Sequence, residues 1–313
     1  MSLSVVIPSY NQRSELTTCL DTLQHVSTDL EIIVVNGPST DGTSGIIERR
    51  DDVDCLIECS SRNLNVARNI GLHEATNDRI ALLAPQYRVG EQWATAIIET
   101  LDGEVDAVSG PVTPSTESRP DEIGDPGSEA DMAINGGNVA LTRSALTALD
   151  GFDEYLEIGG ARDLYRRLTH VRLHLVWHPE MRVTPSQSAG ENAGIDPAGW
   201  QEQGDPKWGP RYRSRAYLEV KNRGVRPGVI ATLGGAAIRD GATAARDVLR
   251  GHGRPSAWVG NGVSVLTNTI RGIRDGWSAR RADATATRNP HGMSRVDKEC
   301  IAARTDRRNT TPP

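Results

Sequence analysis

Polar and aromatic side chains follow the first β-branched segment of the chain, residues 3–8. They are Pro8, Ser9, Tyr10 and Asn11. A hydroxyl, an amide and an aromatic ring can hydrogen-bond to and stack on the base and ribose of a nucleotide. The same residue types also suit an ordinary strand-to-helix turn, in which Ser9 or Asn11 caps the helix. We therefore take this segment as a candidate nucleotide-binding loop, with helix capping as the alternative.

A second polar run, residues 36–43, follows the next β-branched segment. Its candidate binding residues are Asn36, Ser39 and Asp41. The amide of Asn36 can hydrogen-bond the edge of a uracil or guanine base. Ser39 or Asp41 can also cap the helix that follows. The run predicts a second binding loop, and capping is compatible with that function.

The hydrophobic pattern predicts the elements that position these loops. Buried parallel strands are expected at residues 3–8, 31–35, 53–58, 79–83 and 173–177, and helices at 14–24, 44–50 and 65–75. Such alternation predicts an α/β fold with a mostly parallel sheet and helices on both faces. Ligands of these sheets bind at the carboxyl ends of the strands. The loops at residues 9–12, 36–43 and 84–88 all lie there.

Four motifs carry a resemblance to a known family. They are VVIPSYN at 5–11, VVNGPSTDGT at 34–43, NVARNIG at 65–71 and GGNVALTRSALTALDGFDE at 136–154. In this order and spacing they resemble family 2 glycosyltransferases. The resemblance covers roughly the first 185 residues and implies a GT-A fold, a Rossmann-like mixed sheet with helices on both faces.

The resemblance also implies roles for residues outside the first two loops. Arg68 and Asn69 match the donor-side Ala-Arg-Asn segment, with Asn63 in place ahead of it, and the planar guanidinium of Arg68 suits a diphosphate. A solvated helix arginine is the alternative. On the acceptor side the matching residues are Gly136, Gly137 and Asn138. Asn36 and Gly37 stand where the family carries acidic residues for the base, so the choice of base stays open.

The chain departs from the family where a divalent ion is usually held. Ala84 and Gln86 occupy the Asp-x-Asp positions, and Thr184 stands near the position of a late metal-binding histidine. Alanine and glutamine offer no anionic ligand for magnesium or manganese. We therefore expect no metal cofactor. One of three arginines, Arg88, Arg162 or Arg68, could neutralise the leaving diphosphate instead, and we assign Arg88 to the donor site.

The position of the catalytic base also departs from the family. Its usual Glu-Asp pair falls on Gly160 and Ala161, which leaves Asp163 and Glu157 as candidates. Either could deprotonate an acceptor hydroxyl within hydrogen-bond reach. The resemblance implies transfer of a sugar from a nucleotide-sugar donor to a glycan, carried by a polyprenyl phosphate, in cell-surface glycoprotein or polysaccharide assembly. The alternative is a non-catalytic protein that binds donor or acceptor and scaffolds a partner transferase.

Composition excludes several other classes. The chain has 313 residues and a net charge of −6, and its 35 basic residues include three lysines. This lysine-poor, acidic composition is typical of a salt-adapted or high-GC organism. Basic residues are not interleaved with aromatics, so nucleic acid is not expected as a partner. No G-x-G-x-x-G follows the first strand, which argues against a nucleotide-binding oxidoreductase.

The remaining sequence predicts the domain organisation. We expect a glycosyltransferase-like domain at 1–215, a helical segment at 216–281 and a disordered tail at 282–313, with an exposed loop at 113–131. A stripe from Val259 to Trp277, with arginines at its end, suits contact with a membrane interface over 259–281. Packing onto the domain core is the alternative. With neither a signal peptide nor a spanning segment expected, we place the protein on the cytoplasmic face of the cell membrane.

Overall fold

The computed structural model describes residues 2–26, 29–112, 134–186, 208–249, 255–283, 285, 288–296 and 298–308. The chain divides into two units. The first contains residues 1–154, 160–201 and 291–313, and the second contains residues 155–159 and 202–290. The predicted boundary at residue 215 falls within a helix of the second unit, and the predicted loop at 113–131 lies outside the described residues.

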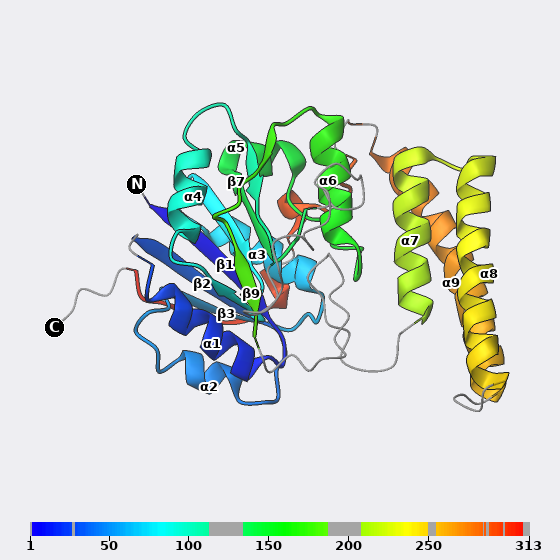
Figure 1. Cartoon of the computed structure of the whole chain (residues 1–313), viewed down its shortest axis with the longest axis horizontal. Coiled ribbons are helices and arrows are strands. Elements are labelled where there is room, and N and C mark those ends of the chain that lie inside the picture. The colour runs from blue at the N-terminus through cyan, green and yellow to red at the C-terminus, as the bar shows by residue number, and fades with distance from the viewer. Residues whose placement is uncertain are drawn as a thin grey trace. The chain divides into compact units, whose positions relative to one another are not determined.

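The described part of the first unit is built on a sheet of eight strands in the order β10-β3-β2-β1-β4-β7-β6-β8. Their bounds are β1 Leu3–Ser9, β2 Leu30–Asn36, β3 Cys55–Cys59, β4 Arg79–Leu83, β6 Ala107–Ser109, β7 Asn138–Thr142, β8 Leu175–Trp177 and β10 Ile301–Asp306. Figure 1 labels β1, β2, β3 and β7 of this sheet. Strands β1 to β4 pair in parallel, whereas β7 and β10 pair antiparallel with their neighbours. A second, two-stranded sheet joins β5 Tyr87–Val89 to β9 Val183–Pro185. The predicted mixed α/β sheet is confirmed.

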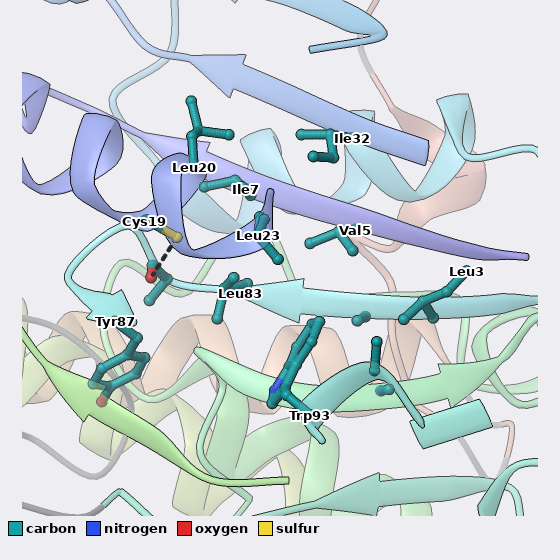
Figure 2. Close-up of a cluster of buried hydrophobic side chains, with 14 of the residues drawn as sticks. Leu3, Val5, Ile7, Cys19, Leu20, Leu23, Ile32, Leu83, Tyr87 and Trp93 are labelled. Atoms are coloured by element: carbon teal, nitrogen blue, oxygen red, sulfur yellow. Dashed lines mark hydrogen bonds between the residues drawn. The ribbon is translucent and has the colours of Figure 1, made fainter. Parts of the chain in front are cut away.

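Alternation along the central strands divides the apolar core between the two faces of the sheet. Val5 and Ile7 belong to one buried cluster, and Val6 belongs to the other. Figure 2 shows the first cluster, in which Trp93 packs with side chains of β1 and β4. Both faces are therefore sealed by helices, which explains why the strands read as continuous apolar runs.

Among the residues that the structure describes, six α-helices belong to this unit: α1 Arg13–Leu23, α2 Thr43–Ile47, α3 Leu64–Glu74, α4 Trp93–Thr100, α5 Arg143–Leu149 and α6 Gly160–His170. In α1 the apolar residues Leu16, Leu20 and Leu23 recur at helical spacing and are all buried. Residues of α1 and α4 contribute to the first core cluster, and residues of α3, α5 and α6 to the second. The first three of these helices match the predicted positions within two or three residues.

The C-terminal strand corrects the prediction of a disordered tail over residues 282–313. Strand β10 pairs with β3 at the sheet edge. Just beyond it, Arg308 donates to Glu31 Oε1 at 2.8 Å and to Asp306 Oδ2 at 2.7 Å. Local composition missed this strand because its stabilising partners lie far away in the sequence.

Three helices make up most of the second unit: α7 Trp208–Arg223, α8 Pro227–Leu249 and α9 Pro255–Ala282. Helix α9 packs against α7 through small residues, since a Cβ on Gly276 would lie 2.7 Å from Tyr217 O. The opposite side of α9 carries Val263, Leu266 and Ile270, which are 58–62% exposed. Among the described residues, no helix is both long and apolar enough to cross a membrane.

The ion pairs of β10 predict how stability depends on pH. Burial raises the pKa of Glu31, but hydrogen bonds from Ser4, Thr76 and Arg308 outweigh it and hold that pKa below its usual value. The hydrogen bond from Arg308 likewise lowers the pKa of Asp306. Carboxyl groups with lowered pKa values stabilise the fold above their unfolded pKa of about 4, and this stability is lost as the pH falls through the folded pKa.

We predict that Arg308→Ala lowers the free energy of unfolding at pH 7 by about 1–2 kcal/mol. The variant should also lose less stability than the wild type between pH 7 and pH 3, because both carboxyl pKa values move back toward normal. Urea denaturation across this pH range measures both effects, with exposed Arg49→Ala as the matched control. Parallel stability profiles for the wild type and Arg308→Ala would contradict the assignment.

Candidate functional site

The loops after β1 and β2 are joined by a chain of hydrogen bonds. Asn11 has a left-handed backbone, with φ of 52°, which asparagine tolerates better than most residues. Its N–H donates to Ser39 Oγ at 2.8 Å, and that hydroxyl donates to Asn36 Oδ1 at 2.8 Å. Asn11 Oδ1 also accepts from the Thr40 N–H at 2.8 Å. The two predicted binding loops therefore form one connected rim at the carboxyl edge of the sheet.

Within this rim, Asn36 and Asp41 serve the structure of the loops. Asn36 is fully buried, and its amide donates to Ser44 Oγ at 3.0 Å. Asp41 Oδ2 accepts from the Arg13 N–H at the start of α1, and its Oδ1 accepts from the Thr43 hydroxyl at 2.6 Å. Burial raises the pKa of Asp41, but these hydrogen bonds outweigh it and lower the pKa overall. Asp41 Oδ1 also accepts from the Thr43 N–H at 3.1 Å at the start of α2, in line with the capping alternative, and contact of Asn36 with a donor stays a prediction.

The residues at the end of β1 differ in accessibility. Pro8 is buried within the strand opposite Val35. The Ser9 side chain is fully buried, and its Oγ has no hydrogen-bond partner among the described residues. Tyr10 is half-buried, and the Arg62 guanidinium lies 5.7 Å from its ring centroid. Tyr10, Asn11 and Ser39 are half-buried residues of the rim, and part of each side chain is accessible to a ligand.

Helix α3 directs its asparagines at the backbone of the Gly-Phe-Asp-Glu turn. Asn63 caps the helix and donates to Glu154 O at 2.6 Å. Asn69 is fully buried, accepts from the Phe152 N–H at 2.8 Å and donates to Phe152 O at 2.8 Å. Asn63 and Asn69 therefore clamp the backbone of this turn, and their predicted contact with the donor stays a prediction.

Arg68 extends the same clamp to residues 135–137. Its side chain is 1% exposed and donates to Asn65 Oδ1 and Gly136 O, each at 2.9 Å. The guanidinium also lies 4.8 Å from the ring centroid of Phe152. Burial lowers the pKa of Arg68 to about 9. The solvated-arginine alternative is therefore wrong, and Arg68 holds two loops together.

The predicted acceptor-side residues Gly136, Gly137 and Asn138 are all buried. Asn138 accepts from the Trp93 indole N–H at 2.8 Å and donates to Met181 O at 2.8 Å. A Cβ on Gly137 would lie 2.5 Å from the Ala84 Cβ, so a larger residue does not fit there. These three residues pack at the start of β7, beside the carboxyl end of β4.

The positions that hold a divalent ion in the family carry no carboxylate here. Ala84 and Gln86 are 5% and 7% exposed, and among the described residues no cluster of three His, Cys, Asp or Glu side chains is arranged for a metal. Thr184 pairs directly opposite Arg88 in the β5–β9 ladder. The donor set at these positions therefore does not fit Mg²⁺ or Mn²⁺, which prefer anionic oxygen ligands.

The two candidate bases lie in different environments. Asp163 is fully buried and accepts from Arg167 Nε at 2.7 Å, and Arg167 also donates to Gly151 O at 2.8 Å. A carboxylate in this buried ion pair has no access to an acceptor hydroxyl, so the catalytic role predicted for Asp163 is not supported. Glu157 is exposed and remains the candidate base.

Sequence reasoning missed Asn65 and Asn135, which complete the clamp. Asn65 Nδ2 donates to Asp153 O at 3.3 Å, and Asn135 Oδ1 accepts from the Gly137 N–H at 2.9 Å. The signal was the recurrence of asparagine at positions 63, 65 and 69 around Arg68. Asn65 and Asn69 are four residues apart and therefore lie on one face of the helix, where buried amides need hydrogen-bond partners.

Comparison with known proteins agrees with this architecture. Residues 4–129 match the family described as glycosyl transferase family 2. The glycosyltransferase AglE of Haloferax volcanii is 30% identical over 118 residues, which cover 35% of this chain and 39% of that protein. The putative glycosyltransferase EpsH of Bacillus subtilis is 27% identical over 111 residues, 34% of this chain and 32% of that protein. The matches thus span less than half of either relative.

Solved structures share the fold over most of the chain. The mannosyltransferase PcManGT from Pyrobaculum calidifontis, in complex with GDP-Man and Mn²⁺, has a TM-score of 0.55 at 16% identity and covers 87% of both chains. The S. aureus TarS 1-349 structure has a TM-score of 0.58 at 13% identity, over 90% of this chain and 83% of that one. The predicted GT-A fold is confirmed.

We predict that Asn69→Ala lowers the free energy of unfolding by about 2–4 kcal/mol, because it leaves the buried Phe152 N–H and C=O unsatisfied. Guanidinium denaturation measures the change. Gln92→Ala is the matched control, since exposed Gln92 precedes α4 without a side-chain cap and should change stability by less than about 0.5 kcal/mol. Equal stability of the two variants would disprove the clamp.

Proposed function

We propose that this chain, which belongs to glycosyl transferase family 2 through residues 4–129, transfers a sugar from a nucleotide-sugar donor to a glycan acceptor. The observation that carries the proposal is the rim formed by the loops after β1 and β2. Hydrogen bonds through Ser39 hold this rim together, and Tyr10 and Asn11 stay half-buried on it. An aromatic ring beside amide and hydroxyl groups suits a base and ribose.

In the proposed reaction the acceptor oxygen forms a bond to the anomeric carbon of the sugar. The bond between that carbon and the β-phosphate oxygen breaks, and the nucleoside diphosphate leaves with the electron pair. The acceptor hydroxyl gives its proton to a carboxylate, for which Glu157 is the exposed candidate. Asp163 and Arg167 keep the nearby turn in place instead of taking this proton.

The proposed acceptor is a glycan carried by a polyprenyl phosphate, met at the cytoplasmic face of the cell membrane. Support comes from the exposed apolar side of α9, where Val263, Leu266 and Ile270 follow one another at helical spacing. Trp277 lies near its end, with the Arg281 guanidinium 3.7 Å from the ring centroid. A helix with this composition suits reversible contact with anionic headgroups. Cell-surface glycoprotein or polysaccharide assembly is the proposed pathway class.

One observation favours a second function. Gly160 and Ala161 are buried at the usual Glu-Asp positions, and a Cβ on Gly160 would lie 2.5 Å from the Asn65 amide. A Cβ at position 160 would therefore require the Asn65 side chain to shift away from its contact with the Gly-Phe-Asp-Glu turn. A protein that keeps the donor rim but scaffolds a partner transferase is consistent with this packing.

Calorimetry against a panel of UDP- and GDP-sugars tests the donor, and a comparison of lipid-linked glycans between a deletion strain and its parent tests the pathway. A transferase should bind one donor. The deletion strain should then carry a truncated glycan, and the wild-type gene should restore the full-length glycan. Restoration by Glu157→Gln as well would favour the scaffold. Absence of binding to any donor by the folded protein would overturn the proposed function.

We predict that donor binding changes less than about twofold on adding EDTA, because Ala84 and Gln86 give a divalent ion no anionic ligand. Calorimetry with and without the chelator measures this. A sharp loss of affinity that manganese restores would show that metal ligands come from elsewhere in the chain.

We also predict that the protein floats with vesicles of anionic lipid and that Leu266→Glu combined with Ile270→Glu abolishes flotation. Burying two charges at a lipid interface costs far more than leaving them in water. The matched control places glutamates at exposed polar positions of the same helix, Thr267 and Ser278. Unchanged flotation of the Leu266/Ile270 variant, or none by the wild type, would contradict membrane contact through α9.

A further inference from the structure

We propose that Arg88 is a built-in cation that binds the diphosphate of the donor where other members of the family hold a divalent ion. The inference rests on the proposed function and adds the group that binds the phosphates. Arg88 lies in the β5–β9 pair, close in sequence to Ala84 and Gln86, the two positions that lack carboxylates.

The first observation is the state of the Arg88 side chain. It is half-buried, and its Nε is inaccessible to solvent without a hydrogen-bond partner among the described residues. A buried guanidinium N–H that finds no acceptor costs free energy, so native proteins rarely keep one. An acceptor from a bound ligand removes that cost.

The second observation is where Arg88 lies. In β5 it alternates with Tyr87, which packs into the core, so the two side chains leave the strand on opposite faces. Arg88 pairs across the ladder with Thr184 and follows Gln86 by two residues. Both neighbours stand at positions where the family resemblance expects metal ligands. The positive charge is therefore placed beside the site that the missing ion would occupy.

The third observation is Ser9 at the end of the neighbouring strand β1. Its hydroxyl is fully buried and has no partner within the described part of the chain. Continuing the β1–β4 register beyond Val6 and Leu82 sets Ser9 level with Pro85. The same register places the segment that leads to Arg88 beside the end of β1, which the rim residues Tyr10 and Asn11 follow. Ser9 is as buried as Asn36 and Asp163, so the half-buried guanidinium of Arg88 is the better-placed group to contact a phosphate.

The other arginines considered for this role are placed differently. Arg68 is 1% exposed, and its guanidinium donates to Asn65 and to Gly136 O. Arg162 is exposed on the first turn of α6. Arg88 combines partial burial with an unsatisfied N–H. A cation in this setting interacts more strongly with the diphosphate as negative charge develops on its leaving oxygen.

The test is calorimetry of the full chain in EDTA, with UDP and GDP compared with uridine and guanosine. We expect the wild type to bind one diphosphate more tightly than its nucleoside. Arg88→Gln should weaken the diphosphate at least about tenfold and leave the nucleoside unchanged, because a charge-assisted hydrogen bond is lost. The affinity of Arg88→Lys for the diphosphate should lie between those of the wild type and Arg88→Gln. The exposed Arg49→Gln variant is the charge-matched control.

The outcomes separate this inference from the proposed function. If Arg88→Gln and Arg88→Lys bind the diphosphate as the wild type does, or if Arg162→Gln alone weakens it, the role of Arg88 is overturned while donor binding stands. A wild type that needs manganese to bind the diphosphate overturns it as well. If the folded wild type binds no nucleotide, the proposed function fails and the inference fails with it.

Discussion

The hydrogen bonds from α3 to two distant backbone segments hold the candidate site together. Asn69 satisfies both the N–H and the C=O of Phe152, and Arg68 reaches Gly136 O from the next position along the helix. These backbone groups are buried, so without the asparagine and arginine each would lose a hydrogen bond that water cannot replace. The sheet supplies the frame, and α3 fixes the acceptor-side loops to it.

This arrangement separates groups that shape the site from groups that face a ligand. Asn36, Asn138 and Asp163 are fully buried, and their polar atoms form hydrogen bonds with neighbouring protein groups. Tyr10 and Arg88 are half-buried at the carboxyl edge. Most polar residues near the edge therefore contribute rigidity, and Tyr10 and Arg88 are the ones proposed to contact the donor.

Much of the fold could be predicted because its signals are local. Alternation of Val5, Val6 and Ile7 indicated a strand buried on both faces, and Leu16 and Leu20 indicated the helix after it. The carboxyl edge followed from the parallel order of the strands. These patterns need no knowledge of distant partners.

What could not be predicted depended on how each side chain is oriented in the folded chain and on partners that the local pattern does not reveal. An asparagine at the end of a strand looks the same in sequence whether it faces a ligand, as expected of Asn36, or a neighbouring hydroxyl, as the structure shows. Asp163 likewise matched a catalytic pattern, yet its ion pair with Arg167 sits on a helix face turned to the core. Strand β10 is polar, and the register that defines it comes from β3.

The pairing of β10 with β3 also sets an order of events during synthesis. Strand β3 ends at Cys59, whereas its outer neighbour begins at Ile301, so the ribosome must add the whole helical unit before this edge is closed. At 5–20 residues per second, that interval lasts roughly 12 to 50 s. Throughout it, the nascent chain presents an open strand with unpaired amides, the kind of edge that recruits other chains. Pairing of β10 with β3 therefore ends this period of exposure.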